Sequence, residues 1–176
     1  MAKEGKRIQF DMSMETSGKP VKASMSEYAE LALPIDANPL GHLLGGKVMH
    51  LVDLAGSLAA VRHARRPCVT ASIDHMNFLC PIHIGQLVVL KSSVNRAFGT
   101  SMEVGVKVFV EDMTTGVVRH TSSAYLTFVA LDENGAPTPV PPVIPETEDE
   151  KRRYEEAGKR RQVRLSLRPR GGKIAS

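Results

Sequence analysis

The chain has 176 residues, of which 42% are hydrophobic and 24% are charged. This length and balance suit one globular domain with tails, and no apolar run is long enough to cross a bilayer. The net charge of +4 arises from residues 158–176, which contain seven basic residues and no acidic one. Such a segment is either a solvated tail or an anion site. Nucleic-acid binding is disfavoured, because basic and aromatic residues do not alternate.

Residues 1–24 are polar and lack the apolar core of a signal peptide, which predicts a flexible segment and a cytoplasmic location. Cys68 and Cys80 have no second cysteine or histidine at metal-ligand spacing, so we expect reduced thiols and no structural zinc.

Residues 26–33 indicate a strand that ends at Pro34. A helix is predicted from Gly46 to His63, because the segment is apolar on nearly every side and ends in basic residues before Pro67. Four stretches of strand character follow, at 68–79, 86–96, 101–111 and 116–131.

Short glycine-containing links between these four strands favour antiparallel hairpins. The economical fold is α+β, with a five-stranded antiparallel sheet wrapped around one long central helix. The sheet edges and its second face would then need cover, which favours dimers or larger assemblies. We therefore expect three parts, namely the flexible segment 1–24, a domain at 25–135, and 136–176, which combines a proline-rich link, a charged helix at 148–159 and a basic tail.

Asp53 is the unusual residue of the helix, because it lies between Val52 and Leu54. A buried carboxylate is either satisfied by a neighbouring donor or kept reactive as a base or nucleophile. Gly56 and Ala60 would leave space beside it, which favours the reactive role.

Other catalytic patterns are weak. Residues 41–47 match G-x-x-x-x-G-K, but the magnesium-binding Ser or Thr is replaced by Val48, and no strand–helix alternation follows. The sequence around Ser57 is not G-x-S-x-G. No metal-binding spacing connects the histidines, which we expect to be ordinary surface or core residues: His42, His50, His63, His75, His83 and His120.

Three stretches together resemble the hotdog-fold acyl-CoA thioesterases, specifically the cytosolic acyl-CoA hydrolases of the brain and bacterial type. They are "LPIDANPLGHLLGGKVMHLVDLAG", "VTASIDHMNFLCPIHIG" and "RAFGTSMEVGV", and the likeness runs from Met25 to Leu131. The combination is an Asn before a glycine-rich turn, the pattern G-G-x-x-M, and an Asp seven residues after the second glycine.

This resemblance implies hydrolysis of acyl-CoA to a free acid and CoA without a further cofactor. It implies that Asp53 is the catalytic base or nucleophile and that Asn38 orients the water or the thioester. The Gly45–Gly46 turn would polarise the thioester carbonyl, and Thr70 would place a hydroxyl near the site.

Gly46 and Asp53 are separated by roughly 10 Å of helix rise, so one helix can hardly place both around one carbonyl. We therefore expect a site shared by two subunits, in a dimer or a trimer of dimers. CoA phosphates call for basic or polar partners. The candidates are Arg96, Thr100, Ser101, Arg160 and Arg161, with Lys159 beside them.

Two alternatives remain open at this point. One is a non-catalytic acyl-CoA sensor on the same fold, which would not need an acid in the helix. The other is a hotdog dehydratase, which would need a placed histidine, with His42 as the candidate.

Overall fold

The computed structural model describes residues 17–74 and 76–167. Its elements are β1 (Lys19–Pro20), η2 (Val21–Ala23), β2 (Ser26–Leu31), η3 (Pro34–Asp36), α1 (Gly45–Ala64), β3 (Cys68–Ile73), β4 (Leu87–Phe98), β5 (Ser101–Glu111), β6 (Val118–Ala130), β7 (Val143–Ile144) and α2 (Glu148–Ser166).

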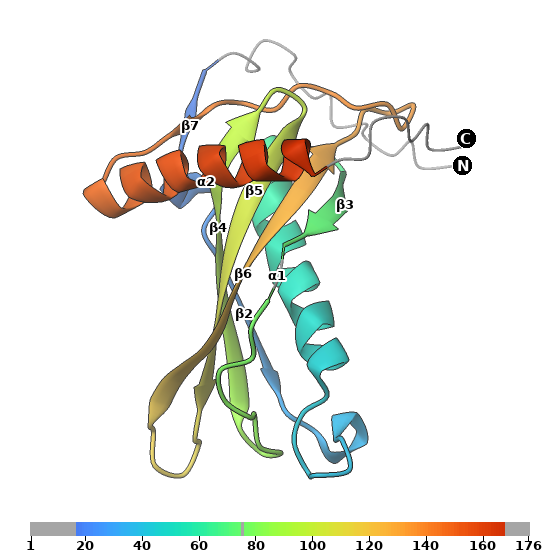
Figure 1. The fold of residues 1–176 in the computed structure, drawn as a ribbon, viewed down its shortest axis with the longest axis vertical. Helices are drawn as coiled ribbons and strands as arrows, with labels where there is room; N and C mark the ends of the chain where they lie inside the picture. Colours follow the sequence, from blue (N-terminus) through green and yellow to red (C-terminus); the bar gives the residue numbers. More distant parts are fainter. Residues whose placement is uncertain (1–16, 75, 168–176) are drawn as a thin grey trace, which may run out of the picture.

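Five strands form an antiparallel sheet in the order β2-β4-β5-β6-β3. The sheet curls around α1, and α2 crosses its other face (Figure 1). Period-two alternation places the valines of β5 on the α1 side, where Val104, Val106 and Val108 are at most 1% exposed. The predicted α+β hotdog fold, with a long central helix against a five-stranded antiparallel sheet, is confirmed.

Small residues let α1 approach the sheet closely. A side chain at Gly56 would bring its Cβ within 3.0 Å of the Phe128 ring on β6, and Ala59 and Ala60 are fully buried. The expectation that Gly56 and Ala60 open space beside Asp53 is therefore wrong. These two residues serve close packing of the helix on the sheet instead.

One face of α1 is not covered by the sheet. Met49, Leu58 and Val61 are 40–43% exposed, although the sequence led us to expect a helix surrounded on all sides. The edge strand β3 adds Val69 and Ile73, which are 47% and 37% exposed. An apolar helix face beside an unpaired strand edge is a surface that usually requires a partner.

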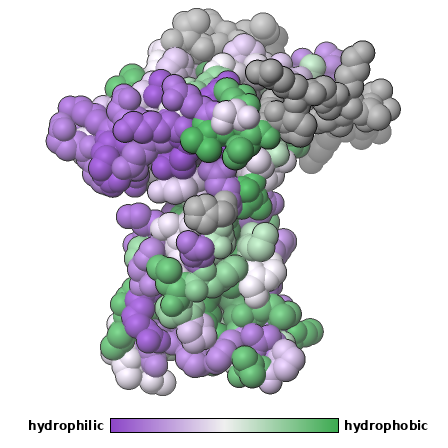
Figure 2. All heavy atoms as spheres, in the orientation of Figure 1, coloured by the Kyte–Doolittle hydropathy of each residue, from purple (hydrophilic) through white to green (hydrophobic). Residues whose placement is uncertain are grey.

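The charged helix α2 is longer than predicted and is docked on the sheet. Thr147 and Glu150 form a capping box at its start. At its far end Arg160 and Arg164 pair with Glu103 of β5, whose side chain is 0% exposed. Residues 158–166 are therefore not a solvated tail, and 168–176 lie outside the described residues. Figure 2 shows hydrophilic residues gathered over α2.

Segments at both ends of the domain also pair with each other. Residues 17–24, within the predicted flexible segment, include β1, which pairs in parallel with β7 of the proline-rich link. Val21 and Val143 are buried, at 3% and 5% exposure, so these segments add to the core.

The predicted strand 68–79 ends at Ile73. After it, the Asp74 N–H still donates to the Tyr125 carbonyl, and the Leu79 N–H donates to the Thr121 carbonyl. These two hydrogen bonds hold Asp74 and Leu79 beside β6 outside the regular strand, an arrangement that apolar composition alone does not distinguish from a strand.

Candidate active site

Asp53 faces β3 and is only partly buried. The Thr70 hydroxyl donates to Asp53 Oδ1 over 2.5 Å, and Thr70 itself is exposed. Within the described residues, Oδ2 has no hydrogen-bond donor. The carboxylate is thus oriented through one oxygen, while the other is left without a protein donor among the described residues.

The glycine turn supplies free backbone donors. Helix α1 begins at Gly45 without a side-chain cap. The N–H of Val48 donates to the Leu44 carbonyl in the first hydrogen bond of the helix. Among the described residues the N–H groups of Gly45 and Gly46 have no acceptor, as is usual for a first helical turn. A Cβ at Gly46 would meet nothing within 4 Å, so there is open space on the side of the residue where a side chain would lie. The helix start can therefore receive an oxyanion.

Asn38 lies in the loop before this turn, and its amide has a defined orientation. The Oδ1 atom accepts from the N–H groups of Leu40 and His42, at 2.9 and 3.1 Å. The Nδ2 donor is left without an acceptor among the described residues. Asn38 can therefore act on a ligand as a hydrogen-bond donor.

Lys47 follows the second glycine, but its ammonium is already paired with carboxylates and is not free for a phosphate. Its ammonium pairs with Glu30 at 2.7 Å and with Asp36 at 3.5 Å. The hydrogen bond from Lys47 lowers the pKa of Glu30. This lysine anchors the helix start to β2, which removes the remaining support for a phosphate loop.

The site residues fall into two groups. Asp53 and Thr70 are in contact, and Asn38 and the Gly45–Gly46 turn lie together at the start of α1, but no contact joins the two groups within the described chain. The two groups are separated along α1 by roughly 10 Å, the rise of seven helical residues.

The predicted CoA contacts lie around the β4–β5 hairpin and α2. Arg96 is stacked on Tyr154, 4.2 Å from the ring centroid, and Arg161 lies 4.4 Å from that of Phe98 and donates to Ser101 Oγ. Thr100 is half-buried in the same hairpin. The structure thus brings these residues together, and their contact with CoA stays a prediction.

Arg160 has a different environment. Its guanidinium donates to Glu103 at 2.6 Å and covers the Tyr125 ring at 3.6 Å. Because this cation already has a buried carboxylate and an aromatic partner, it has less freedom than Arg161 to bind a phosphate.

The histidines that the structure describes do not form a metal site. No group of three or more His, Cys, Asp or Glu in the described chain could hold a metal ion. His42 packs on His83 with ring centroids 4.8 Å apart, and buried His63 contacts the Pro141 carbonyl. Burial lowers the pKa of His63. His75 lies outside the described residues.

Phe78 is a site residue that the sequence did not single out. Its side chain is 50% exposed, and a Cβ at Gly45 would lie 3.4 Å from its ring. Phe78 therefore packs beside Gly45 at the start of α1. Its place in an expected strand concealed this position.

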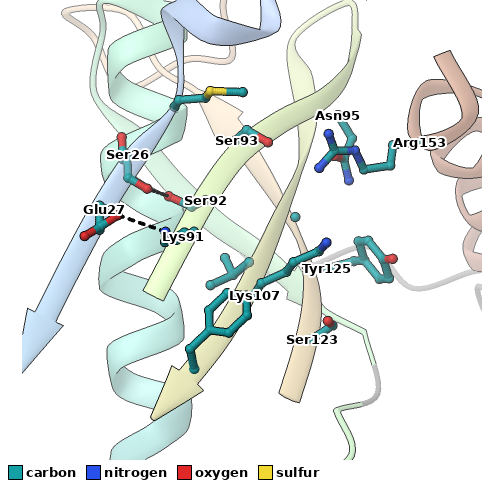
Figure 3. A pocket seen from close by; sticks show the side chains of 14 residues that line it. Ser26, Glu27, Lys91, Ser92, Ser93, Asn95, Lys107, Ser123, Tyr125 and Arg153 are labelled. Atoms are coloured by element: carbon teal, nitrogen blue, oxygen red, sulfur yellow. Dashed lines mark hydrogen bonds and ion pairs between the residues drawn. The ribbon is translucent and has the colours of Figure 1, made fainter. Parts of the chain in front are cut away.

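A pocket of about 470 Å³ occupies the outer face of the sheet, opposite α1 (Figure 3). Its lining contains Lys91, Lys107, Tyr125 and Arg153 but neither Asp53 nor Asn38. No described helix is both long and apolar enough to span a membrane.

The Thioesterase superfamily model matches residues 40–117, which include the glycine turn and Asp53. An acyl-CoA thioester hydrolase of Bacillus subtilis, YkhA, is 49% identical over 117 residues, which cover 66% of this chain and 68% of that protein.

Two solved structures share the fold. The acyl-CoA hydrolase of Staphylococcus aureus, solved with butyryl-CoA and CoA, is 34% identical to this chain with a TM-score of 0.79. The match covers 84% of this chain and 90% of the Staphylococcus aureus chain. Structures of its alanine variants at an aspartate, an asparagine and a threonine also match.

A hexameric acyl-CoA thioesterase is 41% identical to this chain with a TM-score of 0.80. The match covers 86% of this chain and 99% of the chain of that thioesterase. The chain thus combines an acid in the central helix with clear sequence similarity to enzymes. Both observations disfavour the alternative of a non-catalytic acyl-CoA sensor. The chain belongs to the thioesterase superfamily and is a hotdog-fold acyl-CoA thioester hydrolase.

Proposed function

We propose that the enzyme hydrolyses acyl-CoA at a site built from two subunits, with Asp53 of one and Asn38 and the glycine turn of the other. The observation that carries the proposal is the separation of these two groups in a single chain. A reacting carbon must lie about 3 Å from both the oxyanion donors and the attacking water. A second copy supplies the missing half.

Asp53 acts as the general base. Thr70 holds one carboxylate oxygen, and the other takes a proton from water as that water attacks the thioester carbonyl. The proton then passes to the departing sulfur, so that acyl-CoA and water give a free acid and CoA. The partial exposure of Asp53 supports this role, because a water molecule can reach the free oxygen.

The developing negative charge on the carbonyl oxygen would be stabilised at the start of α1. The N–H groups of Gly45 and Gly46 have no acceptor among the described residues, and the positive end of the helix dipole favours an anion there. The Asn38 amide, already fixed as a donor, supplies a further hydrogen bond to the same oxygen or to the water.

The uncovered apolar surface supports the dimer. The exposed side of α1 and the free edge of β3 lie next to Asp53, so a partner that covers them would also approach the carboxylate. A hexamer, as a trimer of dimers, is the assembly we infer from the hexameric relative.

The variants of the Staphylococcus aureus enzyme support the choice of residues. Its replaced asparagine, aspartate and threonine are spaced by 15 and 17 residues, as are Asn38, Asp53 and Thr70 here. We also infer a cytoplasmic location, which cell fractionation would test.

Co-expression of Asp53→Ala and Asn38→Ala chains tests the shared site. Each heterodimer would contain one site with both substitutions and one with neither, so thiol release should return although each variant alone is inactive. If purified mixed dimers stay inactive while both variants are folded and dimeric, the two groups do not work across subunits.

A further inference from the structure

The outer-face pocket brings cations together in a way that the fold does not require. In the register of the sheet, Lys91 of β4 is directly opposite Lys107 of β5. Like charges in directly opposed positions destabilise a pair of strands. Arg153 of α2 completes the group from above the sheet, as Figure 3 shows.

The carboxylates nearby offset the charge of this group only in part. Glu27 is 3.5 Å from the Lys91 ammonium, but both side chains are about 60% exposed, and such pairs contribute little. Asp149 pairs with Arg153 at 3.0 Å. Lys107 has no ion pair within 4.0 Å among the described residues, but its charge reaches Asp149, whose pKa is lowered by the hydrogen bond from Arg152 and by the charges of Arg153 and Lys107. The pocket lining therefore carries three cations and one carboxylate.

A glycine keeps the floor of the pocket open. Gly105 lies between Ser93 and Tyr125 on the neighbouring strands. A Cβ at this position would come within 2.9 Å of Asn95 Nδ2, so the site accepts no side chain without displacing the amide. The hollow that results is bordered by hydroxyl groups of Ser93, Ser123 and Tyr125.

The size and lining indicate the ligand class. A volume of about 470 Å³ is within the usual range for small-molecule pockets and far exceeds one inorganic anion. Phe109, Met25 and Tyr125 provide apolar surface beside the cations. We propose that this pocket binds a small organic phosphate, with its phosphate on Lys107 and Arg153 and its apolar part against Phe109.

This site is separate from the thioester site, because the sheet lies between the pocket and α1. Ligand binding should therefore persist when CoA occupies the enzyme. The proposal does not depend on the roles of Asp53 and Asn38, and its test does not use activity.

Phenyl phosphate is a suitable probe, because it joins a dianion to a flat apolar ring. We expect calorimetry on the full-length protein with saturating CoA to show one site per chain. Loss of one charge-assisted hydrogen bond should weaken binding about tenfold in Lys107→Gln and in Arg153→Gln. Ser123→Leu, which fills the pocket without changing charge, should also weaken it.

Arg152→Gln is the matched control, because Arg152 lies on the same helix but outside the pocket and pairs with Asp149 and Glu156. Its affinity should stay within twofold of the unaltered protein. Absence of binding, competition by CoA, or an equal loss in Arg152→Gln would each overturn the proposal. Competition would show that CoA itself binds in the pocket. An equal loss of affinity in Arg152→Gln would show that the overall positive charge of α2, and not the pocket, attracts the phosphate.

Discussion

Replacement of Glu103 by glutamine tests how α2 is held on the sheet. The Glu103 carboxylate is 0% exposed and accepts hydrogen bonds from Asn95 and Arg164. It also forms an ion pair with Arg160 at 2.6 Å. Glutamine keeps the volume and one acceptor oxygen but removes the charge that both guanidinium groups need.

The size of the effect follows from these contacts. A hydrogen bond to a charged group contributes about 1.5–3 kcal/mol and a neutral one about 1 kcal/mol, so weakening two of them costs about 2 kcal/mol. The side chains of Arg160 and Arg164 are 23% and 22% exposed, so their guanidinium groups can regain water. The loss should therefore stay below the 3–5 kcal/mol that is typical when a fully buried pair is broken.

Urea denaturation at one fixed protein concentration measures this difference, because oligomer stability depends on concentration. Glu156→Gln is the control, since Glu156 also faces Arg160, at 3.8 Å, but is 37% exposed. It should leave the midpoint nearly unchanged. If the two variants lose equal stability, burial of the Glu103 charge does not hold α2 in place.

Three further predictions concern the site and the cysteines. Thr70→Val removes the donor to Asp53 and should lower kcat about tenfold with little change in KM, as steady-state thiol release would show; an unchanged kcat would contradict the orienting role. Single-turnover hydrolysis in ¹⁸O-water should place the label in the released acid, whereas an unlabelled acid would make Asp53 the nucleophile. Burial raises the pKa of Cys68 to about 11, so the thiolate is scarce at neutral pH. Alkylation of Cys68 in the folded protein should be slow at pH 8 and accelerate toward pH 11, and rapid labelling at pH 8 would refute its burial.

The sequence was sufficient for the central part of the fold because each element carries its own periodicity. The alternation of residues 101–111 defines β5 with the bounds that the structure has. The predicted helix from Gly46 to His63 differs from α1 by one residue at each end. The prediction failed after Ile73, where apolar residues such as Met76, Phe78 and Leu79 suggested that the strand continued, although the regular strand ends there.

The docking of α2 could not be read from the sequence. A run of basic residues has the same composition whether it is solvated or packed, and the partner that decides the question, Glu103, is 57 residues from Arg160. Its position in a strand of alternating valines gives no sign that the outer face will be covered. Only the three-dimensional arrangement shows that this glutamate requires cations.

For the site, the sequence indicated the residue types but not the surroundings. Asp53 was expected inside a helix enclosed by the sheet, where only burial could make it unusual. The structure gives a different physical reason for its place in α1. The helix has to contact two surfaces, the sheet on one side and, as we propose, a second subunit on the other. A carboxylate at the boundary between them stays hydrated in the single chain, and it can be enclosed together with the partner's glycine turn only when two chains meet. An acid in the middle of an apolar helix is then compatible with folding of the monomer, because the energetic cost of desolvation arises at assembly, where the substrate and the second set of donors are also present.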